Sequence, residues 1–576
     1  MLLSNMELLA TAPGGVAKLR ELILTLAVQG KLVPQDLADE PAGRLLQKIR
    51  AEKDRLMAEG KIKRDKPLAE IPEEEKPFEL PKGWEWVRLG AVVNASEAGW
   101  SPTCIGSPRR PGHWGVLKVS AVSWGRFDPT ANKELPSELA PKPEYEVKDG
   151  DFLLSRANTA ELVARSVLVG VAEPQLMLSD KIIRLAVSSQ MNRAFLNMVN
   201  NASYSREHYA ANASGTSSSM KNVSREVLMA LPVPLPPLAE QSRIVTRVDA
   251  LMRLCDALQA KGQLEAAQHG QLVSTLLGTL TASTTPEELA NNWQRVAQHF
   301  DLLLDRPEAI DALEQTLLQL AVRGLLVPQD PTDEPASALL QKIRTEKDRL
   351  IATGQIKRDK PLPPITDEEK PFELPVGWEW VPIDTLATVG TGTTPSRENP
   401  TFFVGGTTPW VTSGETGQTY IDATEQHVTD VALAQTSLTV YPVGTLILAM
   451  YGQGKTRGQV AELRIPAATN QACAAIALIE SAAHHRAYVK LVFEKSYDEI
   501  RELSAGGAQP NLNVGKVKST LIPLPPLAEQ SRIVTRVTAL RRLCADLRQR
   551  LAERQSVQAR LAEALVETAS FSSEPC

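Results

Sequence analysis

The sequence is poor in cysteine, in aromatic residues and in net positive charge. Its five cysteines are scattered along 576 residues and form no Cys-x-x-Cys pair, which argues against a zinc site and favours a reducing cytosol. No apolar run approaches the roughly 20 residues that a membrane-spanning helix needs. The N-terminus has no basic segment ahead of an apolar stretch, so no signal peptide is predicted. We therefore expect a cytoplasmic protein that does not contact a membrane.

The net charge of −5 is a point against nucleic-acid binding, because proteins of that class usually carry a basic face. It does not exclude such binding, since the distribution of charge matters more than the sum. The remaining composition, with 43% hydrophobic and 23% charged residues, is that of an ordinary globular protein. A chain of this length is expected to form two or more hydrophobic cores.

A long internal repeat is the dominant feature of the sequence. Residues 22–89 align without a gap on residues 316–383, and 48 of these 68 pairs are identical. A second block, Pro234–Val248, is identical to Pro523–Val537 at an offset of 289. The chain therefore contains one framework twice. Two equal frameworks predict two equal partner sites related by a pseudo-two-fold axis.

Between the framework blocks lie two inserts, about 88–233 and 382–522, which share almost no residues and which we interpret as unrelated. Two different inserts predict two different targets. Drift after duplication would also make the inserts differ. Random drift alone would have changed the framework copies as well. We therefore favour a functional reason for the difference between the inserts.

The framework is predicted to be helical. Pro41 at the first turn and Gly60 after the last turn bound a helix over residues 42–59, and Pro335 and Gly354 bound its second copy. A proline-rich, charged strap follows each helix. The motif Gly-Trp-Glu-Trp-Val after the strap has the alternation of a strand.

Each copy of Leu-Pro-Pro-Leu-Ala-Glu-Gln leads into a second helix with a coiled-coil seam. The seam residues are Ile244, Val248, Leu251, Cys255 and Leu258 in the first copy, and Ile533, Val537, Leu540, Cys544, Leu547 and Leu551 in the second. The two seam cysteines are predicted to be packing residues and not reactive thiols. A helix of about 40 residues is about 60 Å long, so two such helices packed antiparallel would hold the inserts at opposite ends.

These motifs resemble those of the specificity subunits of type I restriction–modification enzymes, over about Leu19 to Leu565. The resemblance implies two target-recognition domains that each bind one half of a split double-stranded DNA site. It also implies framework helices that set the unread spacer and dock two methyltransferase subunits. Adenine methylation with S-adenosylmethionine, and restriction with ATP and Mg by two further subunits, would belong to these partners. No cofactor or metal is expected in this chain.

We therefore predict an α+β fold with two mixed α/β target-recognition domains. Long antiparallel, coiled-coil-like framework helices join them in a circular pseudo-two-fold arrangement, in which the two ends of the chain lie close together. The predicted boundaries are 1–83 for the N-terminal helical framework and strap, 84–237 for the first recognition domain, 238–376 for the central helical framework, 377–526 for the second recognition domain and 527–576 for the C-terminal helix.

One segment resembles a nucleotide-binding loop. Ala449–Thr456 fits a relaxed phosphate-loop pattern, but the residues after it predict a strand and not the helix that such a loop requires. No Asn-Pro-Pro-Tyr-type methyltransferase motif and no Gly-x-Gly-x-x-Gly after a strand are present. The isolated pair His484-His485 is interpreted as surface. We predict that this chain carries no catalytic residue.

Candidate DNA contacts in the first insert begin where a predicted strand runs into Arg156 and Asn158. Arginine can form two hydrogen bonds to guanine, and asparagine two to adenine. Basic and polar residues of other loops are candidates for phosphate contacts. The full set in this insert is Arg109, Arg110, Lys118, Ser120, Arg156, Asn158, Lys181, Thr216, Lys221 and Asn222.

In the second insert, the candidates lie on the loop after the strand at about 445–450 and on a glycine-bearing polar loop before the closing helix. They are Gln453, Lys455, Thr456, Arg457, Gln509, Asn511, Asn513 and Lys516. Any one of these side chains taken singly is more often only solvated. Neither insert is basic, with 15 Lys and Arg against 13 Asp and Glu in residues 91–230, and 10 against 12 in 384–522. Weak DNA binding is therefore expected from this chain alone.

Two alternatives from other classes stay open at this point. A scaffold that pairs two identical partner subunits without contacting DNA would explain the duplicated framework, but not the two different inserts. A nucleotide-dependent enzyme would rest on Ala449–Thr456 alone. Exchange of one insert tests the first alternative, and Lys455→Ala tests the second.

Overall fold

The computed structural model describes residues 6–64, 67–215, 220–358, 360–452, 456–497, 499 and 512–571. The chain forms two compact units. Unit 1 comprises residues 1–265 and 555–576, and unit 2 comprises 266–554. The boundaries between the units, at 265/266 and 554/555, both lie inside long helices. They are 289 residues apart, which is the offset of the second repeat block, so they fall at equivalent positions of the repeat. Among the described helices, none is both long and apolar enough to span a bilayer.

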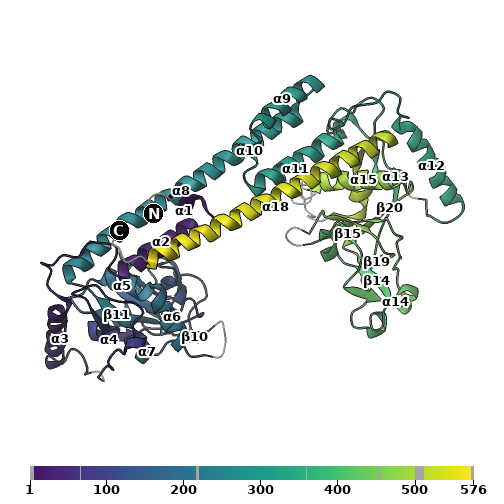
Figure 1. Cartoon of the computed structure of the whole chain (residues 1–576). Coiled ribbons are helices and arrows are strands. Elements are labelled where there is room, and N and C mark those ends of the chain that lie inside the picture. The colour runs from purple at the N-terminus through teal and green to yellow at the C-terminus, as the bar shows by residue number, and fades with distance from the viewer. Residues whose placement is uncertain are drawn as a thin grey trace. The chain divides into compact units, whose positions relative to one another are not determined.

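Unit 1 contains a helical framework and the first insert (Figure 1). The framework helices are α1 (Met6–Thr11), α2 (Gly15–Val28), α3 (Ala42–Ala58), the first part of α8 (Leu238–Ala282) and the last part of α18 (Leu527–Phe571). Val248 and Cys255 of α8, Leu22 of α2 and Ala562 of α18 are buried in one core. Lys18 and Glu563 form an ion pair of 2.9 Å, so α2 lies beside the end of α18.

The insert of unit 1 is built on a four-stranded antiparallel sheet and a smaller three-stranded sheet. The first has the order β2 (Val93–Ala98), β9 (Ile182–Val187), β5 (Phe152–Ser155), β7 (Ser166–Leu168). The second has the order β4 (Asn132–Glu134), β3 (Gly115–Leu117), β8 (Leu176–Met177). The pair β1 (Glu85–Arg88) and β11 (Pro232–Leu235) closes the insert where it leaves the framework. The short helices are α4 (Leu89–Val92), α5 (Arg193–Asn201), α6 (Ser203–Asn212), α7 (Arg225–Met229), η2 (Glu73–Glu75), η3 (Val119–Val122) and η4 (Pro143–Tyr145).

Unit 2 has the same plan. Its framework consists of the rest of α8 and α18 with α9 (Pro286–Gln298), α10 (Phe300–Leu303), α11 (Pro307–Val322) and α12 (Ala336–Ala352). Its larger sheet has the order β13 (Ala387–Thr391), β20 (Cys473–Leu478), β17 (Leu446–Ala449), β18 (Val460–Leu463), β15 (Tyr420–Ile421), and its smaller sheet the order β16 (Gln426–Val428), β14 (Thr408–Val411), β19 (Ala468–Thr469). The pair β12 (Glu379–Pro382) and β21 (Leu521–Leu524) closes this insert. The short helices are α13 (Ile383–Leu386), α14 (Asp430–Gln435), α15 (Ala483–Lys495), α17 (Val514–Lys518), η5 (Asp367–Glu369), η6 (Pro400–Phe402) and η7 (Ser413–Gly417).

The two inserts share one topology. The order β2-β9-β5-β7 in unit 1 corresponds to β13-β20-β17-β18 in unit 2, where β15 adds one further strand. The small sheets also correspond, and each contains one parallel pair, β3 with β8 and β14 with β19. The interpretation of the inserts as unrelated is therefore wrong at the level of fold. A strand needs only alternating apolar residues, so two sequences without visible identity can form the same sheet.

The repeated motifs meet in one buried hydrogen-bond network. Glu240, at the start of α8, accepts hydrogen bonds from the indole Nε1 of Trp84 at 2.9 Å and from Nε2 of Gln35 at 2.7 Å. In unit 2, Trp378 and Gln329 donate to Glu529 at 2.9 and 2.7 Å. Burial raises the pKa of both glutamates. In each copy the network ties two segments to the start of the long helix: the segment that precedes the framework helix α3 or α12, and the residue that precedes the strand β1 or β12.

We expect Glu240→Gln to destabilise unit 1, because an amide has one acceptor oxygen for two donors, one of which is the buried indole of Trp84. The expected loss in the free energy of unfolding is about 1–3 kcal/mol. Thermal unfolding with hydrogen exchange resolved by unit measures it. Glu529→Gln should have the same effect on unit 2, and Glu207→Gln, at an exposed position of α6, is the control. Equal stability of Glu240→Gln and Glu207→Gln would contradict the role of the network.

The predicted framework helix and the buried seam cysteines agree with the structure, whereas the assignment of one histidine in the second insert does not. The predicted helix 42–59 is α3 (Ala42–Ala58), which ends before Gly60 with its positive φ of 67°. Cys255 and Cys544 are buried in the helical cores, which confirms them as packing residues. The surface assignment of His485 is wrong, because its Nδ1 lies 2.9 Å from Oε1 of Gln530 in the interior.

Candidate nucleic-acid interface

Five of the predicted DNA contacts in the first insert come together in the structure. The short strand β6 (Ala157–Asn158) pairs with β10 (Lys221–Asn222), which places Lys221 opposite Asn158. The backbone N–H of Arg156 donates to the carbonyl of Lys181 at 2.7 Å. Three segments that are far apart in the sequence therefore form one group of Arg156, Asn158, Lys181, Lys221 and Asn222, which we call the first-insert cluster.

The side chains of this cluster are not equally available. Arg156, Lys181 and Asn222 are exposed. The amide of Asn158 is engaged at both ends, because its Nδ2 donates to Oγ of Ser123 at 2.8 Å and its Oδ1 accepts from the N–H of Thr159 at 2.9 Å. The guanidinium of Arg156 has no ion pair or hydrogen bond among the described residues. Of the two predicted base contacts, Arg156 is therefore the better placed.

Lys118 and Ser120 lie at the start of η3, beside this cluster. Lys118 precedes the helix, and the carbonyl of Ser120 accepts from the N–H of Ser123. Both residues are partly exposed. Their contact with DNA stays a prediction. Lys221 also stays a candidate, although its Nζ donates to the carbonyl of Gly215 at 2.7 Å.

Arg109 and Arg110 are already paired with carboxylates. Arg109 is bonded to Glu173 at 2.8 Å and to the carbonyl of Pro174 at 2.7 Å. Arg110 donates to both oxygens of the buried Glu134 and lowers the pKa of that carboxyl to about 2. Both arginines therefore have a structural role, which the sequence alone did not reveal because the partners lie 24 and 64 residues away.

We expect Arg110→Ala to lower the melting temperature of the protein at pH 7 by a few degrees. Because the pKa of Glu134 is depressed in the folded protein, the pair stabilises fully above the ordinary value of 4.5 and loses its effect as the pH falls towards about 2. The difference in melting temperature between wild type and variant should shrink over that interval. A variant with unchanged stability and weakened DNA binding would instead assign Arg110 to a phosphate contact.

The candidate loops of the second insert are described only in part. Gln453, Lys455, Gln509 and Asn511, and also Thr216 of the first insert, lie outside the described residues. Thr456 and Arg457 are partly exposed and lie on the connection from β17 to β18. The element after this loop is a strand and not a helix, which confirms that the segment lacks the helix of a phosphate loop.

Asn513 and Lys516 lie at the short helix α17. Oδ1 of Asn513 accepts a hydrogen bond from the N–H of Lys516 at 2.9 Å, so Asn513 is the N-cap of this helix. Asparagine is among the preferred residues at that position, and this signal was available in the sequence. Its side-chain oxygen is occupied by this cap. Lys516 is exposed, and its contact with DNA stays a prediction.

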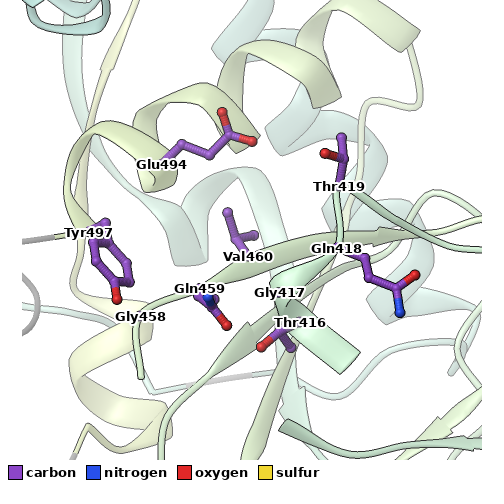
Figure 2. Close-up of a pocket in the computed structure, with 9 residues that line it drawn as sticks. All are labelled: Thr416, Gly417, Gln418, Thr419, Gly458, Gln459, Val460, Glu494 and Tyr497. Atoms are coloured by element: carbon purple, nitrogen blue, oxygen red, sulfur yellow. The ribbon is translucent and has the colours of Figure 1, made fainter. Parts of the chain in front are cut away.

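A shallow polar pocket of about 260 Å³ lies beside the candidate loop of the second insert (Figure 2). Thr416 and Gln418 line it from the end of η7, Gln459 from the start of β18, and Glu494 and Tyr497 from the end of α15. In Figure 2 the hydroxyl of Tyr497 points towards Gly458 and Gln459. Amide and hydroxyl groups suit hydrogen bonds to base edges or sugars. Sequence reasoning missed Gln418 and Gln459, because no motif marks the irregular segments that carry them.

Two further arginines of the first insert were also missed. The three nitrogens of the Arg206 guanidinium are buried and have no hydrogen-bond partner in the part of the chain that the structure describes, and the group lies 5.0 Å from the ring centre of Tyr209. Burial lowers the pKa of Arg206 to about 10, and the neighbouring positive charge of Arg165 acts in the same direction. Arg206 on α6 and Arg165 before β7 thus place two positive charges close together inside the first insert.

Comparison with known proteins identifies the family. The family model described as "Type I restriction modification DNA specificity domain" matches residues 81–268 and 375–554. The type I restriction enzyme EcoEI specificity subunit of Escherichia coli is 35% identical over 579 residues, which cover 96% of this chain and 94% of that protein. The EcoAI specificity subunit of Escherichia coli is 35% identical over 582 residues, with the same coverage. A chain from a solved type I R-M system structure matches with a TM-score of 0.48 and 19% identity, over 86% of this chain and 99% of that one. The chain therefore belongs to the family of DNA specificity subunits of type I restriction–modification systems.

Proposed function

We propose that the two inserts each recognise one half of an asymmetric, two-part sequence of double-stranded DNA. The observation that carries the proposal is one strand order built from two different sequences. Loops on a retained scaffold are where binding specificity usually resides. The strand β5 leads into Arg156, whereas its counterpart β17 leads towards Thr456 and Arg457. Because different hydrogen-bond donors follow these equivalent strands, the comparison supports the recognition of different bases by the two inserts.

We further propose that the framework docks two copies of a methyltransferase subunit. Leu254 of unit 1 and Leu543 of unit 2 occupy the same position of the repeat and are exposed by 60% and 58%. Leu272 of unit 2 and Leu561 of unit 1 form a second matched pair, exposed by 52% and 50%. Each unit thus carries one member of each matched pair, one on α8 and the other on α18. Equal apolar surfaces on both units support two identical partners.

The gap between the two half-sites is proposed to follow from the framework helices. The helices α8 and α18 have 45 residues each, which corresponds to a length of about 68 Å. In the proposed arrangement they run antiparallel within a circular, pseudo-two-fold framework, with the domain boundaries predicted from the sequence. Methyl transfer from S-adenosylmethionine and ATP- and Mg-dependent restriction by two further subunits belong to the partners.

Single-molecule sequencing for methyladenine tests the proposal. The chain is expressed with its methyltransferase subunit in a host without other methylases, and the methyltransferase alone is the control. A two-part asymmetric motif with a fixed gap is expected only when the chain is present. Exchange of residues 84–237 for the matching insert of a relative is expected to change one half of the motif. Co-purification of the two proteins without any motif would favour a scaffold that does not contact DNA.

A further inference from the structure

Trp124 is a large apolar side chain that the first insert leaves in solvent. It is 71% exposed. The indole follows η3 and precedes Gly125, whose φ of 79° gives the chain a tight turn. The turn is fixed, because Oγ of Ser123 donates to the carbonyl of Val119 at 2.8 Å and the N–H of Asp128 donates to that of Ala121 at 3.0 Å. The exposed ring is therefore held on an ordered turn.

This turn adjoins the first-insert cluster. Ser123, the residue before Trp124, accepts the hydrogen bond from Nδ2 of Asn158 at 2.8 Å. The exposed Arg126 follows two residues later. Carboxylates are also present, since Asp128 lies on the same turn and Asp180 precedes Lys181. The surroundings of the indole thus combine cations with polar groups, as the surface around a DNA groove contact requires.

The second insert has no aromatic residue at the corresponding place. Its equivalent segment, η7, is followed by Gln418 and Thr419. The next aromatic residue there, Tyr420, is covered by the guanidinium of Arg464 at 3.6 Å and by Nζ of Lys490 at 4.8 Å from its ring centre. The ring of Trp124 has no aromatic or cationic neighbour of this kind among the described residues. Its exposure is a particular feature of the first insert.

We propose that Trp124 packs against the bases of the first half-site, where its indole makes an apolar contact inside the groove. The occupant is duplex DNA, because Trp124 directly follows Ser123, whose hydroxyl is hydrogen-bonded to Asn158 of the first-insert cluster. The inference rests on the proposed function of the first insert. The indole can make such an apolar contact with two parts of DNA, which are the methyl group of thymine and the face of a partly unstacked base. Both bury apolar surface and contribute to selectivity.

The test uses the complex of the full chain with its methyltransferase subunit. Dissociation constants are measured by fluorescence anisotropy on a duplex that carries the methylated motif and on a scrambled duplex. Trp124→Ala is expected to weaken binding to the specific duplex about tenfold or more and to leave the scrambled duplex unchanged. Trp124→Phe should retain part of the affinity. Trp293→Ala, at an exposed position of α9 in the framework, is the matched control.

Uracil in place of each thymine of the first half-site distinguishes the two sources of the contact. Weaker binding of wild type, with no further loss in Trp124→Ala, assigns the indole to a thymine methyl group. Unchanged binding of wild type, with a loss in Trp124→Ala, assigns it to a base face. Wild-type affinity of Trp124→Ala for the specific duplex would overturn the inference, and so would loss of the methyltransferase subunit from that variant. Failure of wild type itself to prefer the specific duplex would overturn the proposed function as well.

Discussion

Replacement of Leu254 by aspartate is expected to remove one of two methyltransferase subunits from the complex, and replacement of both Leu254 and Leu543 is expected to remove both. A carboxylate at a docked apolar position loses the buried contact and has to be desolvated without a partner. A loss of about 3 kcal/mol or more in binding free energy is expected, which corresponds to roughly 100-fold or more in affinity. Native mass spectrometry measures the number of partner subunits for each variant.

The chain offers a matched control for this experiment. Leu264 of α8 is exposed by 59%, but the same position of the repeat in α18 is Glu553. Two equal docking surfaces cannot depend on a leucine that only one copy has. Leu264→Glu is therefore expected to bind two partner subunits as wild type does. If Leu254→Asp and Leu543→Asp also bind two, the exposed leucines are not part of the docking surface.

The framework could be predicted from the sequence because its boundaries are set locally. Prolines and glycines delimit α3 and α12, and the seam spacing follows α8, whose observed bounds of Leu238–Ala282 contain the predicted seam. The buried role of Glu240 could not be predicted in the same way. Its donors, Trp84 and Gln35, lie 156 and 205 residues away, and the sequence repeat marks all three without showing that they meet.

Residues of the candidate site could be predicted from the sequence only where they directly follow a recognisable strand. Arg156 and Asn158 follow β5 in the sequence, and that strand was recognisable by its apolar residues. The pairing of β6 with β10, each of two residues, depends on tertiary contacts and not on local propensity. Trp124 was overlooked for a related reason. Sequence composition does not reveal whether a single tryptophan is buried, and only the fixed turn after η3 places it in solvent.

Arg156→Ala is expected to abolish the preference for one half of the recognition sequence and to leave the other half unaffected. The exposed guanidinium at the end of β5 can donate two parallel hydrogen bonds to one guanine, and removal of such a pair costs about 1–3 kcal/mol, or roughly 5- to 150-fold in affinity. Arg156→Lys should not restore the preference, because an ammonium group lacks the planar fork of donors. Competition binding with duplexes altered in one half at a time measures the effect.

Lys221→Ala is the informative comparison for that variant, since Lys221 lies opposite Asn158 in the same cluster. A lysine that contacts only phosphate contributes equally to all sequences. Its replacement should weaken specific and scrambled duplexes alike and lower the salt dependence of binding by about one unit of slope. If Arg156→Ala instead behaves like Lys221→Ala, Arg156 contacts the backbone, and the bases of that half-site are recognised by other side chains of the insert.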